Sequence, residues 1–391
     1  MSAVRKEFIV EKFSPLISDT NGVFFSNDIT CGVCLSGEEN PPINIQKAYY
    51  LCGEVYYYDG SYIYNSNYIK ILEKTFLTTP KLYAFYLGEN KKVVVCDNDY
   101  ATVISGNSFI TIPIACVTFA NDTLFGAKGL NIGVGEVLNC ETGYPKHTVS
   151  IKKQHGNIEN LVALNGNIYA FTTSCIYKLS VGIDGETTLK KLNISVRDIT
   201  PSSVATVGDK IMFFANGFFY SLVGETVEKI ESVFSKDIES VSFADCFLGK
   251  YIARVNINGQ DRAFIYDNDL GETLLANGNA VYVGGGKFYD SPTNTMLTLT
   301  ENAIGDYYLW LKPLNLGNHE IKRLRKISFD GKFDYLTVSI KTQRVRAVCK
   351  TDKTLLDVNV AGKYFELTLS AKTPFNLSAI TFIYDKENKI I

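Results

Sequence analysis

The chain contains 391 residues, with 39 basic and 41 acidic side chains and a formal net charge of −2. This near balance excludes a protein that coats nucleic acid through a generally basic surface. A hydrophobic content of 46% and a charged content of 20% exclude intrinsic disorder, and no apolar run reaches the roughly 18 residues of a membrane span. The polar, charged segment Met1–Val10 predicts that no signal peptide is present.

The composition favours strands over helices. The sequence holds 24 Tyr, 24 Phe and 30 Gly against a single Trp. Aromatic residues favour strands, and glycine favours the turns between them. The nine cysteines are scattered and odd in number, whereas a secreted disulfide framework is dense and even. We therefore expect reduced thiols that fill strand cores, in a protein that folds in a reducing cytoplasm, at Cys31, Cys34, Cys52, Cys96, Cys116, Cys140, Cys175, Cys246 and Cys349.

Residues 1–45 are predicted to form an extended N-terminal arm. Apolar side chains lie among polar ones in this segment, which has few turn-and-strand repeats of its own, and Pro41-Pro42 closes it. Such an arm can order on a neighbouring subunit, or it can complete the first blade of a propeller formed by the same chain. The sequence leaves both open. The candidate contact residues of the arm are Phe8, Phe13, Phe24 and Phe25.

Tight-turn dipeptides recur along the chain. Asn-Gly and Asp-Gly tolerate the positive φ angles of two-residue hairpins. Their flanks resemble strands: Lys210–Ala215 precedes Asn216-Gly217, and Phe218–Val223 follows it. A helical pattern is weak everywhere, and only Glu228–Ser240 is a candidate. Turns are therefore expected at Asn21, Asp59, Asn165, Asp184, Asn216, Asn258, Asn277 and Asp330.

A loose repeat runs through the middle of the chain. Each unit begins with an apolar strand, makes a Gly-containing turn and continues with an aromatic-rich strand; its length of about 35 to 45 residues suits one four-stranded propeller blade. An almost purely β chain must also close or stack its sheets to hide their edges. We predict an all-β protein with a β-propeller of about five to seven blades over residues 46–320. The units are placed at 46–78, 79–112, 113–157, 158–200, 201–240, 241–280 and 281–315.

The last segment, residues 321–391, is predicted to be a small C-terminal β-sandwich-like domain. Short strand-like runs separated by turns fill it. Residues 323–391 hold 13 basic and 7 acidic side chains, a net charge of +6, which leaves −8 for the rest of the chain. A difference in sign between regions indicates surfaces with different neighbours.

Catalytic and metal-binding motifs are weak throughout. The histidines His147, His155 and His319 are too few and too scattered for a metal cluster, and Cys31-Gly-Val-Cys34 is half a zinc site without a second pair. The acidic residues that a glycosidase propeller would need lie in turn-like contexts. No dinucleotide-binding or phosphate-binding loop is present. The sequence therefore predicts a protein that is not an enzyme and has no catalytic, cofactor-binding or metal-binding residue.

A basic stretch at the start of the C-terminal domain allows two interpretations. One is a surface that contacts phosphates. The other, which we favour, is a solvated strand face or a face that pairs with an acidic neighbouring subunit. The basic residues alternate with Ile327 and Phe329, and no stacking aromatic residues lie between the arginines. The candidate assembly contacts are Lys322, Arg323, Arg325, Lys326, Arg344 and Arg346.

Four segments in order resemble a known family. They are Ile158–Leu179, Ile199–Tyr220, a unit ending in Ile265-Tyr266-Asp267, and an exit at Leu311–Gly317 that is followed by basic residues. In the order of these segments and in the character of their residues, the chain is similar, over roughly residues 115 to 391, to β-propeller structural proteins of bacteriophage tails and necks. These include the packaged-DNA stabilisation, or tail hub, proteins of short-tailed phages.

The resemblance implies a non-enzymatic virion component that forms a ring on the phage axis, at the neck, tail hub or tail tip. Its role would be assembly together with channel closure or genome retention. It implies other virion proteins as partners (portal, adaptor or tail components), a ring-forming homo-oligomer such as a hexamer, and at most indirect contact with packaged DNA. No membrane insertion is expected, and assembly would take place in the bacterial host cytoplasm. The alternative function is a propeller that binds carbohydrate or protein at a cell surface.

Overall fold

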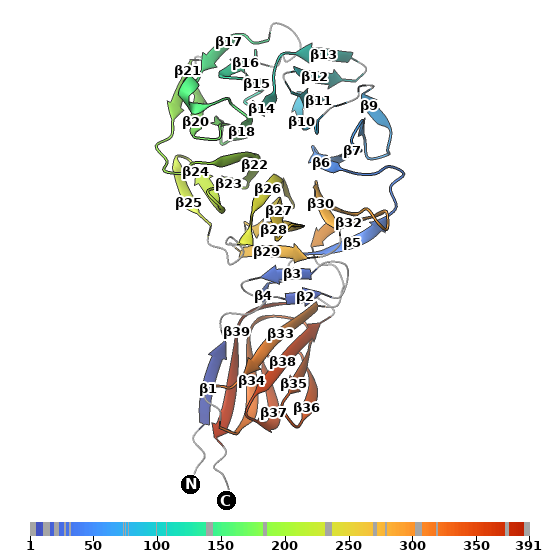
Figure 1. Ribbon diagram of the computed structural model, residues 1–391, viewed down its shortest axis with the longest axis vertical. Coiled ribbons are helices and arrows are strands. Elements are labelled where there is room, and N and C mark those ends of the chain that lie inside the picture. Colours follow the sequence, from blue (N-terminus) through green and yellow to red (C-terminus); the bar gives the residue numbers. More distant parts are fainter. Residues whose placement is uncertain are drawn as a thin grey trace, which may run out of the picture. The chain divides into compact units, whose positions relative to one another are not determined.

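The computed structural model divides the chain into two compact units (Figure 1). Unit 1 comprises residues 1–39, 270–280 and 297–391, and unit 2 comprises residues 40–269 and 281–296. The predicted boundaries, after residues 45 and 320, divide the chain at other points. The structure describes every residue except 1–4, 11–15, 19–22, 27–28, 31–32, 73, 75, 77, 99, 107, 138–143, 183–185, 231–236, 269–271, 278–279, 302–306, 318–319, 372–374 and 387–391.

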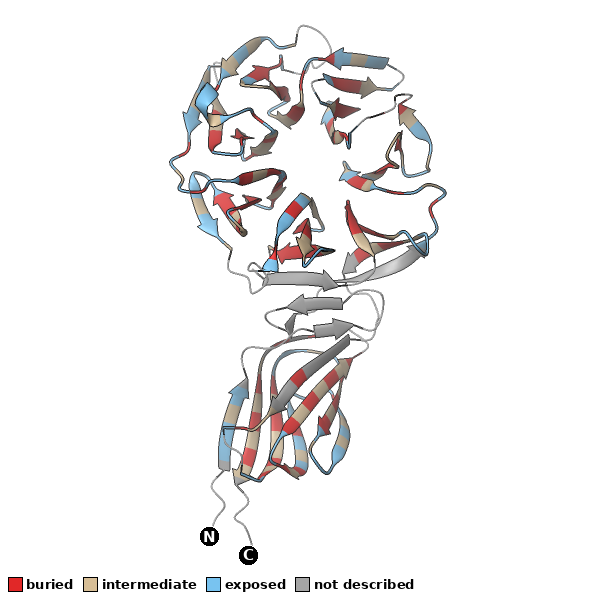
Figure 2. Cartoon of the chain, in the orientation of Figure 1, coloured by how far each residue is buried: buried red, intermediate tan, exposed pale blue. Residues whose placement is uncertain are grey.

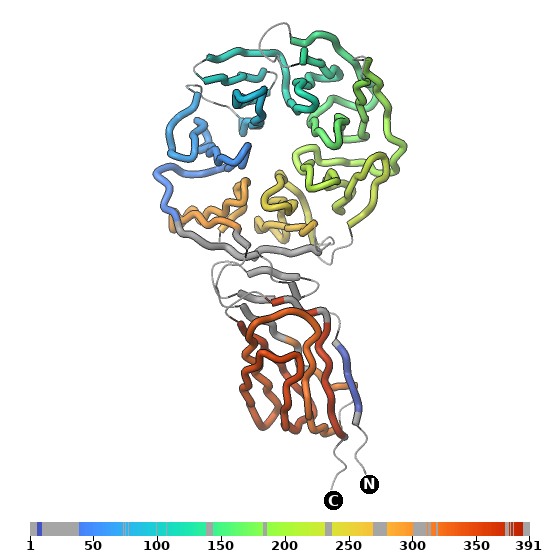
Figure 3. The backbone as a smooth tube through the Cα atoms, turned by 180° about the vertical axis from the view of Figure 1, so that it is seen from behind, coloured from blue at the N-terminus to red at the C-terminus, as the bar shows by residue number. Residues whose placement is uncertain are grey.

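Unit 2 is a series of antiparallel sheets that follow one another in chain order. In Figures 1 and 3 the chain passes from sheet to sheet around a ring, with the first strand of each sheet nearest the centre. Five four-stranded sheets lie wholly within unit 2, and two further groups continue the series, so the seven groups lie at the upper end of the predicted blade number. The prediction of an all-β propeller is confirmed.

The strands of the five sheets are β6 (Lys47–Leu51), β7 (Glu54–Tyr58), β8 (Ile63–Tyr64) and β9 (Lys70–Leu72); β10 (Lys81–Leu87), β11 (Asn90–Asp97), β12 (Tyr100–Ser105) and β13 (Ser108–Ile112); β14 (Cys116–Ala120), β15 (Thr123–Lys128), β16 (Asn131–Val134) and β17 (His147–Ser150); β18 (Asn160–Leu164), β19 (Asn167–Phe171), β20 (Ile176–Val181) and β21 (Thr187–Lys191); β22 (Ile199–Val207), β23 (Lys210–Ala215), β24 (Phe218–Val223) and β25 (Thr226–Lys229). The sixth group begins with β26 (Ser240–Phe247), β27 (Lys250–Ile257) and β28 (Gln260–Asp267), and the seventh with β30 (Val281–Gly284) and β31 (Lys287–Asp290).

Most of the expected tight turns that fall on described residues form. Asn165-Gly166, Asn216-Gly217 and Asn258-Gly259 each place two successive residues at positive φ between paired strands. Asp330-Gly331 does not form a hairpin, because it lies inside strand β34 as an irregularity in pairing. Turns expected at Asn21 and Asp184 lie outside the described residues, as does Gly278 of the turn expected at Asn277.

Helical structure in the described part of the chain comprises the 3-10 turn Lys153–His155 and the single 3-10 residue Asp237. The weak helical window Glu228–Ser240 begins with the end of strand β25 and continues into residues 231–236, which lie outside the description.

The middle strands of each sheet are the most buried. Strands β15, β19 and β23 are buried along nearly their whole length, whereas the fourth strands β17, β21 and β25 alternate between half-buried and exposed residues (Figure 2). A strand with continuous burial has a packed layer on both faces, as expected where each blade lies between two others.

Adjacent sheets share hydrophobic cores, and the ring closes through one of them. The fourth and fifth sheets pack through a cluster that includes Phe171 and Phe213, and the same arrangement joins every earlier pair. The first sheet contributes Ala48 and Tyr57 to a cluster that also holds Val283 and Met296 from the far end of unit 2. The first and seventh blades are therefore held together by the same apolar packing that joins the others.

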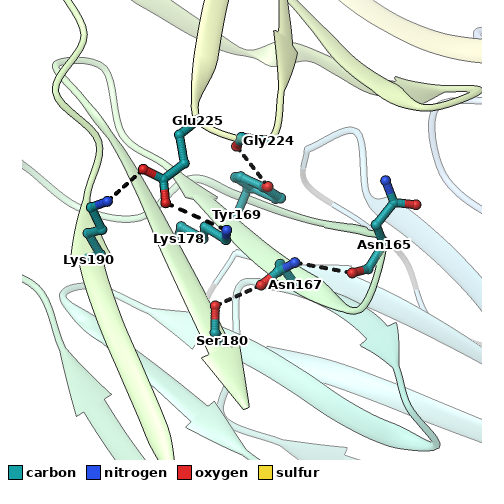
Figure 4. A network of polar contacts seen from close by, with 8 residues as sticks. All are labelled: Asn165, Asn167, Tyr169, Lys178, Ser180, Lys190, Gly224 and Glu225. Atoms are coloured by element: carbon teal, nitrogen blue, oxygen red, sulfur yellow. Dashed lines mark hydrogen bonds and ion pairs between the residues drawn. The ribbon is translucent and has the colours of Figure 1, made fainter. Parts of the chain in front are cut away.

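Polar contacts reinforce the packing between the fourth and fifth sheets (Figure 4). The Tyr169 hydroxyl donates to the Gly224 carbonyl oxygen at 2.9 Å, and the Glu225 carboxylate pairs with Lys190 at 2.6 Å and Lys178 at 3.6 Å. Hydrogen bonding to Lys190 is the largest cause that lowers the pKa of Glu225. Because Glu225 lies at the turn after β24, it links one sheet to the outer strands of its neighbour.

Unit 1 contains two antiparallel sheets built largely from the C-terminal segment. One has the order β1-β39-β34-β37, with β4 also paired to β39, and the other has the order β2-β33-β38-β35-β36. Alternate residues such as Leu324, Val338 and Leu367 are fully buried, which is typical of a sandwich core. The strands of unit 1 are β1 (Arg5–Val10), β2 (Leu16–Ser18), β3 (Val23–Ser26), β4 (Ile29–Thr30), β5 (Val33–Glu39), β29 (Glu272–Asn277), β32 (Thr295–Glu301, whose first two residues belong to unit 2), β33 (Tyr307–Leu314), β34 (Lys322–Lys332), β35 (Leu336–Lys341), β36 (Arg346–Thr351), β37 (Leu355–Gly362), β38 (Phe365–Ala371) and β39 (Asn376–Lys386).

The N-terminal segment is integrated into unit 1. Strand β1 pairs with β39 from Arg5 opposite Asp385 to Val10 opposite Ile380, and β3 pairs with β29. Strand β2 pairs with β33, and β5 adjoins β32. The arm predicted for residues 1–45 therefore has several strands that pair with distant parts of its own chain. The second expectation included pairing within the chain, but the partners are β29, β32, β33 and β39 and not strands of the first blade.

Candidate functional site

The basic residues at the start of strand β34 are engaged within unit 1. Lys322 is fully buried, and its ammonium donates to the carbonyl oxygens of Asn315 at 2.7 Å and Glu320 at 3.1 Å. It therefore cannot present its charge to a neighbouring protein, contrary to its choice as a contact residue. The alternation of hydrophobic residues in the sequence does not reveal the burial of Lys322, because a lysine with carbonyl partners can occupy an inward position.

The other three basic residues at the start of β34 have partners on adjacent strands. Arg325 Nε lies 2.7 Å from the Asp385 carboxylate on β39, and Lys326 Nζ lies 3.1 Å from the Asp357 carboxylate on β37. Arg323 and Arg325 both donate to the Asn359 side-chain oxygen, at 3.2 and 3.3 Å. The structure thus gathers these residues on one sheet face, where cross-strand ion pairs use much of their charge.

Arg344 and Arg346 are the exposed members of the predicted basic set. Arg344 lies in the turn between β35 and β36, and Arg346 begins β36. Arg346 Nε donates to the Ser339 hydroxyl at 3.3 Å, a neutral acceptor that leaves the positive charge of the guanidinium uncompensated. These two residues keep the surface position that the sequence predicted.

The four aromatic candidates of the N-terminal segment are placed unequally. Phe8 is half-buried on β1, opposite Phe382 of β39. Phe24 and Phe25 lie on β3, opposite Ala276 and Leu275, and Phe13 lies outside the described residues. In β1 and β3 the backbone at these positions is already paired within the chain.

The charge difference between regions is smaller when it is counted by compact unit. Unit 1 holds 18 basic and 17 acidic residues, and unit 2 holds 21 and 24. The +6 of residues 323–391 is offset by acidic residues in other segments of unit 1, including Glu38 and Glu39. Long-range attraction between the two units of adjacent copies is therefore weak, and any contact must depend on local surfaces.

A second polar group lies on the inner strands of unit 2, and we call it the inner-strand cluster: Lys47 and Tyr49 of β6, Phe243 and Asp245 of β26, and Tyr282 of β30. Asp245 and Lys47 are both half-buried. The Tyr282 hydroxyl donates to Asp245 Oδ1, and the Gly285 amide donates to Asp245 Oδ2 at 2.7 Å. Residues of the sixth and seventh blades thus meet at one carboxylate, and Lys47 of the first blade lies near enough for its charge to act on it.

Lys47 lies against aromatic rings in this cluster. Its Nζ is 4.6 Å from the ring centroid of Phe243 and 5.0 Å from that of Tyr49, both within the range of a cation–π contact. Burial is the largest cause that lowers the pKa of Lys47, to about 8, and the Asp245 charge opposes this effect. Burial also raises the pKa of Asp245, while hydrogen bonds from Tyr282 and Gly285 and the Lys47 charge counteract that rise.

The turn after β30 is what brings this cluster together. Gly284, Gly285 and Gly286 all have positive φ angles, a conformation that L side chains rarely adopt. A Cβ at Gly284 would overlap the Ala48 carbonyl oxygen of β6, and one at Gly286 would overlap the Phe247 ring of β26. The triple glycine therefore allows β30 to approach both neighbouring inner strands.

Only one sequence feature points to this cluster, the isolated triple glycine. Lys47, Asp245 and Tyr282 were not selected, because each stands alone in its own blade and no spacing connects them. The expected lack of metal ligands rests on His147, His155, His319 and Cys31-x-x-Cys34; Cys31 and His319 lie outside the described residues. Within the described ranges, no three His, Cys, Asp or Glu side chains are grouped as a metal site would require.

The six cysteines whose side chains the structure describes are all free thiols: Cys52, Cys96, Cys116, Cys175, Cys246 and Cys349. Burial raises the pKa of Cys116 to about 11, so this thiol stays protonated and unreactive at neutral pH. No helix in the described part of the chain is long and apolar enough to cross a membrane.

We expect the Lys47 side chain to be unusually reactive near pH 8, because much of it is then a neutral amine. About half of its side chains are then neutral, against well under about 1% for an ordinary lysine with a pKa of about 10.4. Acetylation followed by mass spectrometry should show its rate rising through pH 8 and levelling above it. In Asp245→Asn the rise should move to lower pH, because a charge that favours the ammonium is lost. A midpoint near the ordinary lysine value would contradict the described burial.

Comparison with known proteins identifies no family for this chain. No protein-family model matches it, and no curated protein does. Solved structures with a similar chain path include a streptogramin B lyase, with a TM-score of 0.48 and 11% identity, covering 70% of this chain and 100% of that one. Virginiamycin B lyase from Staphylococcus aureus is similar with a TM-score of 0.37 and 13% identity, covering 70% of this chain and 99% of that one. Hsv2 from Kluyvelomyces marxianus is similar with a TM-score of 0.37 and 13% identity, covering 67% of this chain and 96% of that one. At such low sequence identity, no activity or ligand of these proteins can be assigned to this chain, since one fold serves many functions.

Proposed function

We propose that this chain is a non-enzymatic structural protein of a bacteriophage virion. In this proposal unit 2 is a rigid β-propeller, and the sandwich sheets of unit 1 carry contacts to neighbouring virion proteins such as portal, adaptor or tail components. The chain forms a ring of identical copies at the neck, tail hub or tail tip, after assembly in the host cytoplasm. The resemblance of residues 115 to 391 to phage propeller proteins, in the order and character of their segments, supports the proposal.

One structural observation carries the choice of contact surface. Arg344, Arg346 and Lys350 are exposed on and beside β36, the last strand of its sheet, and the apolar Val345 and Val348 are exposed between them. The basic residues of β34 are less suited to this role, because Arg325 and Lys326 already have carboxylate partners. An edge with mixed apolar and basic side chains is a typical site for contact with another protein.

The test is incorporation into phage particles. The triple variant Arg344→Glu, Arg346→Glu, Lys350→Glu is expected to be incorporated at least tenfold less than the unaltered chain, while its melting temperature stays the same. One reversal is too weak to decide, because an exposed pair contributes about 0 to 1 kcal/mol. The matched control is Lys152→Glu, Lys153→Glu, which reverses two exposed lysines of unit 2. Incorporation of the triple variant at the level of the control would contradict the proposal.

A second candidate is a propeller that binds a carbohydrate or protein at a cell surface. The observation that favours it is the inner-strand cluster, where Lys47 lies beside two rings and a carboxylate. Aromatic rings flanked by polar groups are common in ligand sites. This candidate predicts that Lys47→Met abolishes binding to a glycan or protein array without affecting particle incorporation.

A further inference from the structure

Strand β36 ends its sheet. In the order β2-β33-β38-β35-β36 its one neighbour among the described strands is β35, with Leu336 opposite Thr351 and Lys341 opposite Arg346. An edge strand has a row of backbone N–H and C=O groups without partners in its own sheet, and another chain can pair with them. The outward side of β36 is therefore a surface on which a further strand fits.

The pairing with β35 determines which residues of β36 have outward backbone groups. The Thr342 amide donates to the Val345 carbonyl oxygen at 2.8 Å, so these two residues form a hydrogen-bonded pair in the same register. Hydrogen-bonded and non-hydrogen-bonded pairs alternate along an antiparallel ladder. Ala347, Cys349 and Thr351 consequently bond to β35. The backbone N–H and C=O groups of Arg346, Val348 and Lys350 are directed away from it.

The side chains of these same three residues are exposed. Val348 is 58% exposed, and Arg346 and Lys350 lie two residues to either side of it on the same face. Side chains on one face of a strand repeat about every 7 Å, twice the rise per residue. The nearby acidic side chain of the same sheet face, Glu366, is already paired with Lys341 at 3.2 Å. The edge therefore presents the pattern cation, apolar, cation with little compensating negative charge.

We propose that β36 binds an extended acidic segment of another protein, which adds to the sheet as a further strand. The segment places an acidic residue opposite Arg346, an apolar residue opposite Val348 and an acidic residue opposite Lys350. Its backbone bonds to the outward groups of the same three residues. This inference rests on the proposed function, since it specifies the chemistry of the virion partner that unit 1 contacts.

A second copy of this chain is a poorer occupant of the same edge. Two β36 strands paired antiparallel about Val348 would place Arg346 of each directly opposite Lys350 of the other. Like charges directly opposite each other on a sheet are destabilising. Charge complementarity therefore favours a partner with a different sequence, and it disfavours edge-to-edge dimers.

The test uses the full chain and a synthetic peptide, acetyl-Gly-Glu-Thr-Val-Thr-Glu-Gly-amide, at low salt. Titration is expected to shift the backbone amide NMR signals of Arg346, Val348 and Lys350, and not those of the Lys152 region. The same peptide with N-methylvaline keeps its charge but loses one ladder hydrogen bond, and it should bind at least tenfold more weakly. Equal binding of both peptides would overturn the proposal, because charge alone would then account for it.

Two variants of the protein complete the test. Val348→Pro removes an outward N–H without affecting the bonds to β35, as proline at an edge can, and it should also weaken binding at least tenfold. Arg346→Glu, Lys350→Glu should lose the acidic peptide and gain a matching peptide with Lys in place of Glu. Melting temperatures close to that of the unaltered chain show that both variants fold. Full peptide binding by either variant would overturn the proposal.

The outcome is separable from that of the proposed function. If the acidic peptide does not bind but the triple variant still fails to enter particles, strand addition at β36 is wrong and the virion role stands. If the peptide binds as expected and the triple variant is incorporated normally, the edge is a real docking site that virion assembly does not use. Dimerisation of the unaltered chain through β36 would identify a second copy as the occupant and overturn this inference.

Discussion

Gly284→Ala is expected to lower the free energy of unfolding by about 4 kcal/mol. The added methyl group would overlap the Ala48 carbonyl oxygen, a backbone atom of β6 that cannot move aside as a flexible side chain can. A φ angle of +104° adds backbone strain for any L residue. Overpacking and strain each cost about 1–3 kcal/mol. Chemical denaturation of the purified variant, followed by tyrosine fluorescence, measures the change.

Gly217→Ala is the matched control for this prediction. Gly217 also has a positive φ angle, +77°, but a Cβ there would meet no atom within 4 Å. Its loss of stability should be about 1 kcal/mol, which is the backbone contribution alone. If the two alanine variants lose the same amount, β30 does not approach β6 as closely as described.

Lys250→Met is expected to destabilise the protein by about 3–5 kcal/mol, because it leaves a buried carboxylate without its cationic partner. Lys250 Nζ lies 2.9 Å from the Asp267 carboxylate, across the β27–β28 pair, and their side chains are only 6% and 5% exposed. Asp267 ends the Ile265-Tyr266-Asp267 segment, so this ion pair gives a physical reason for that turn sequence.

The double variant Lys250→Met, Asp267→Leu separates charge from packing. Replacing both partners by apolar residues of similar size removes the desolvation cost together with the attraction, so its stability should return to within about 1 kcal/mol of the unaltered chain. A double variant as unstable as Lys250→Met would show that the pair contributes through shape and not through its charges.

Local patterns were enough to predict the blades. Hairpin dipeptides such as Asn165-Gly166 depend only on the φ angles that their two residues tolerate, and the apolar runs beside them define the strands. The first four predicted units each enclose one four-stranded sheet, for example 158–200 around β18 to β21, and the fifth, 201–240, omits only the first two residues of β22. Repetition of the same strand-and-turn pattern in each blade also made the blades easier to predict.

Pairing between distant segments could not be predicted in the same way. Arg5 and Asp385 are partners in the β1–β39 ladder, yet a six-residue strand carries too little pattern to specify its neighbour. The sequence predicts a surface position for Lys322, because no sequence pattern reveals that backbone carbonyl oxygens will surround its ammonium. The meeting of Lys47, Asp245 and Tyr282 depends on ring closure, which places the first, sixth and seventh blades together.

The apolar cluster that joins Ala48 and Tyr57 to Val283 and Met296 has a consequence for synthesis on the ribosome. The first of these residues emerges long before the last. At a translation rate of about 5–20 residues per second, roughly 10–50 s pass between synthesis of the first-blade surface and synthesis of the seventh-blade residues that cover it. During that time it exposes apolar side chains to the crowded cell, where such surfaces promote aggregation. A nascent chain stalled before residue 281 should therefore recruit chaperones more strongly than one released after residue 296.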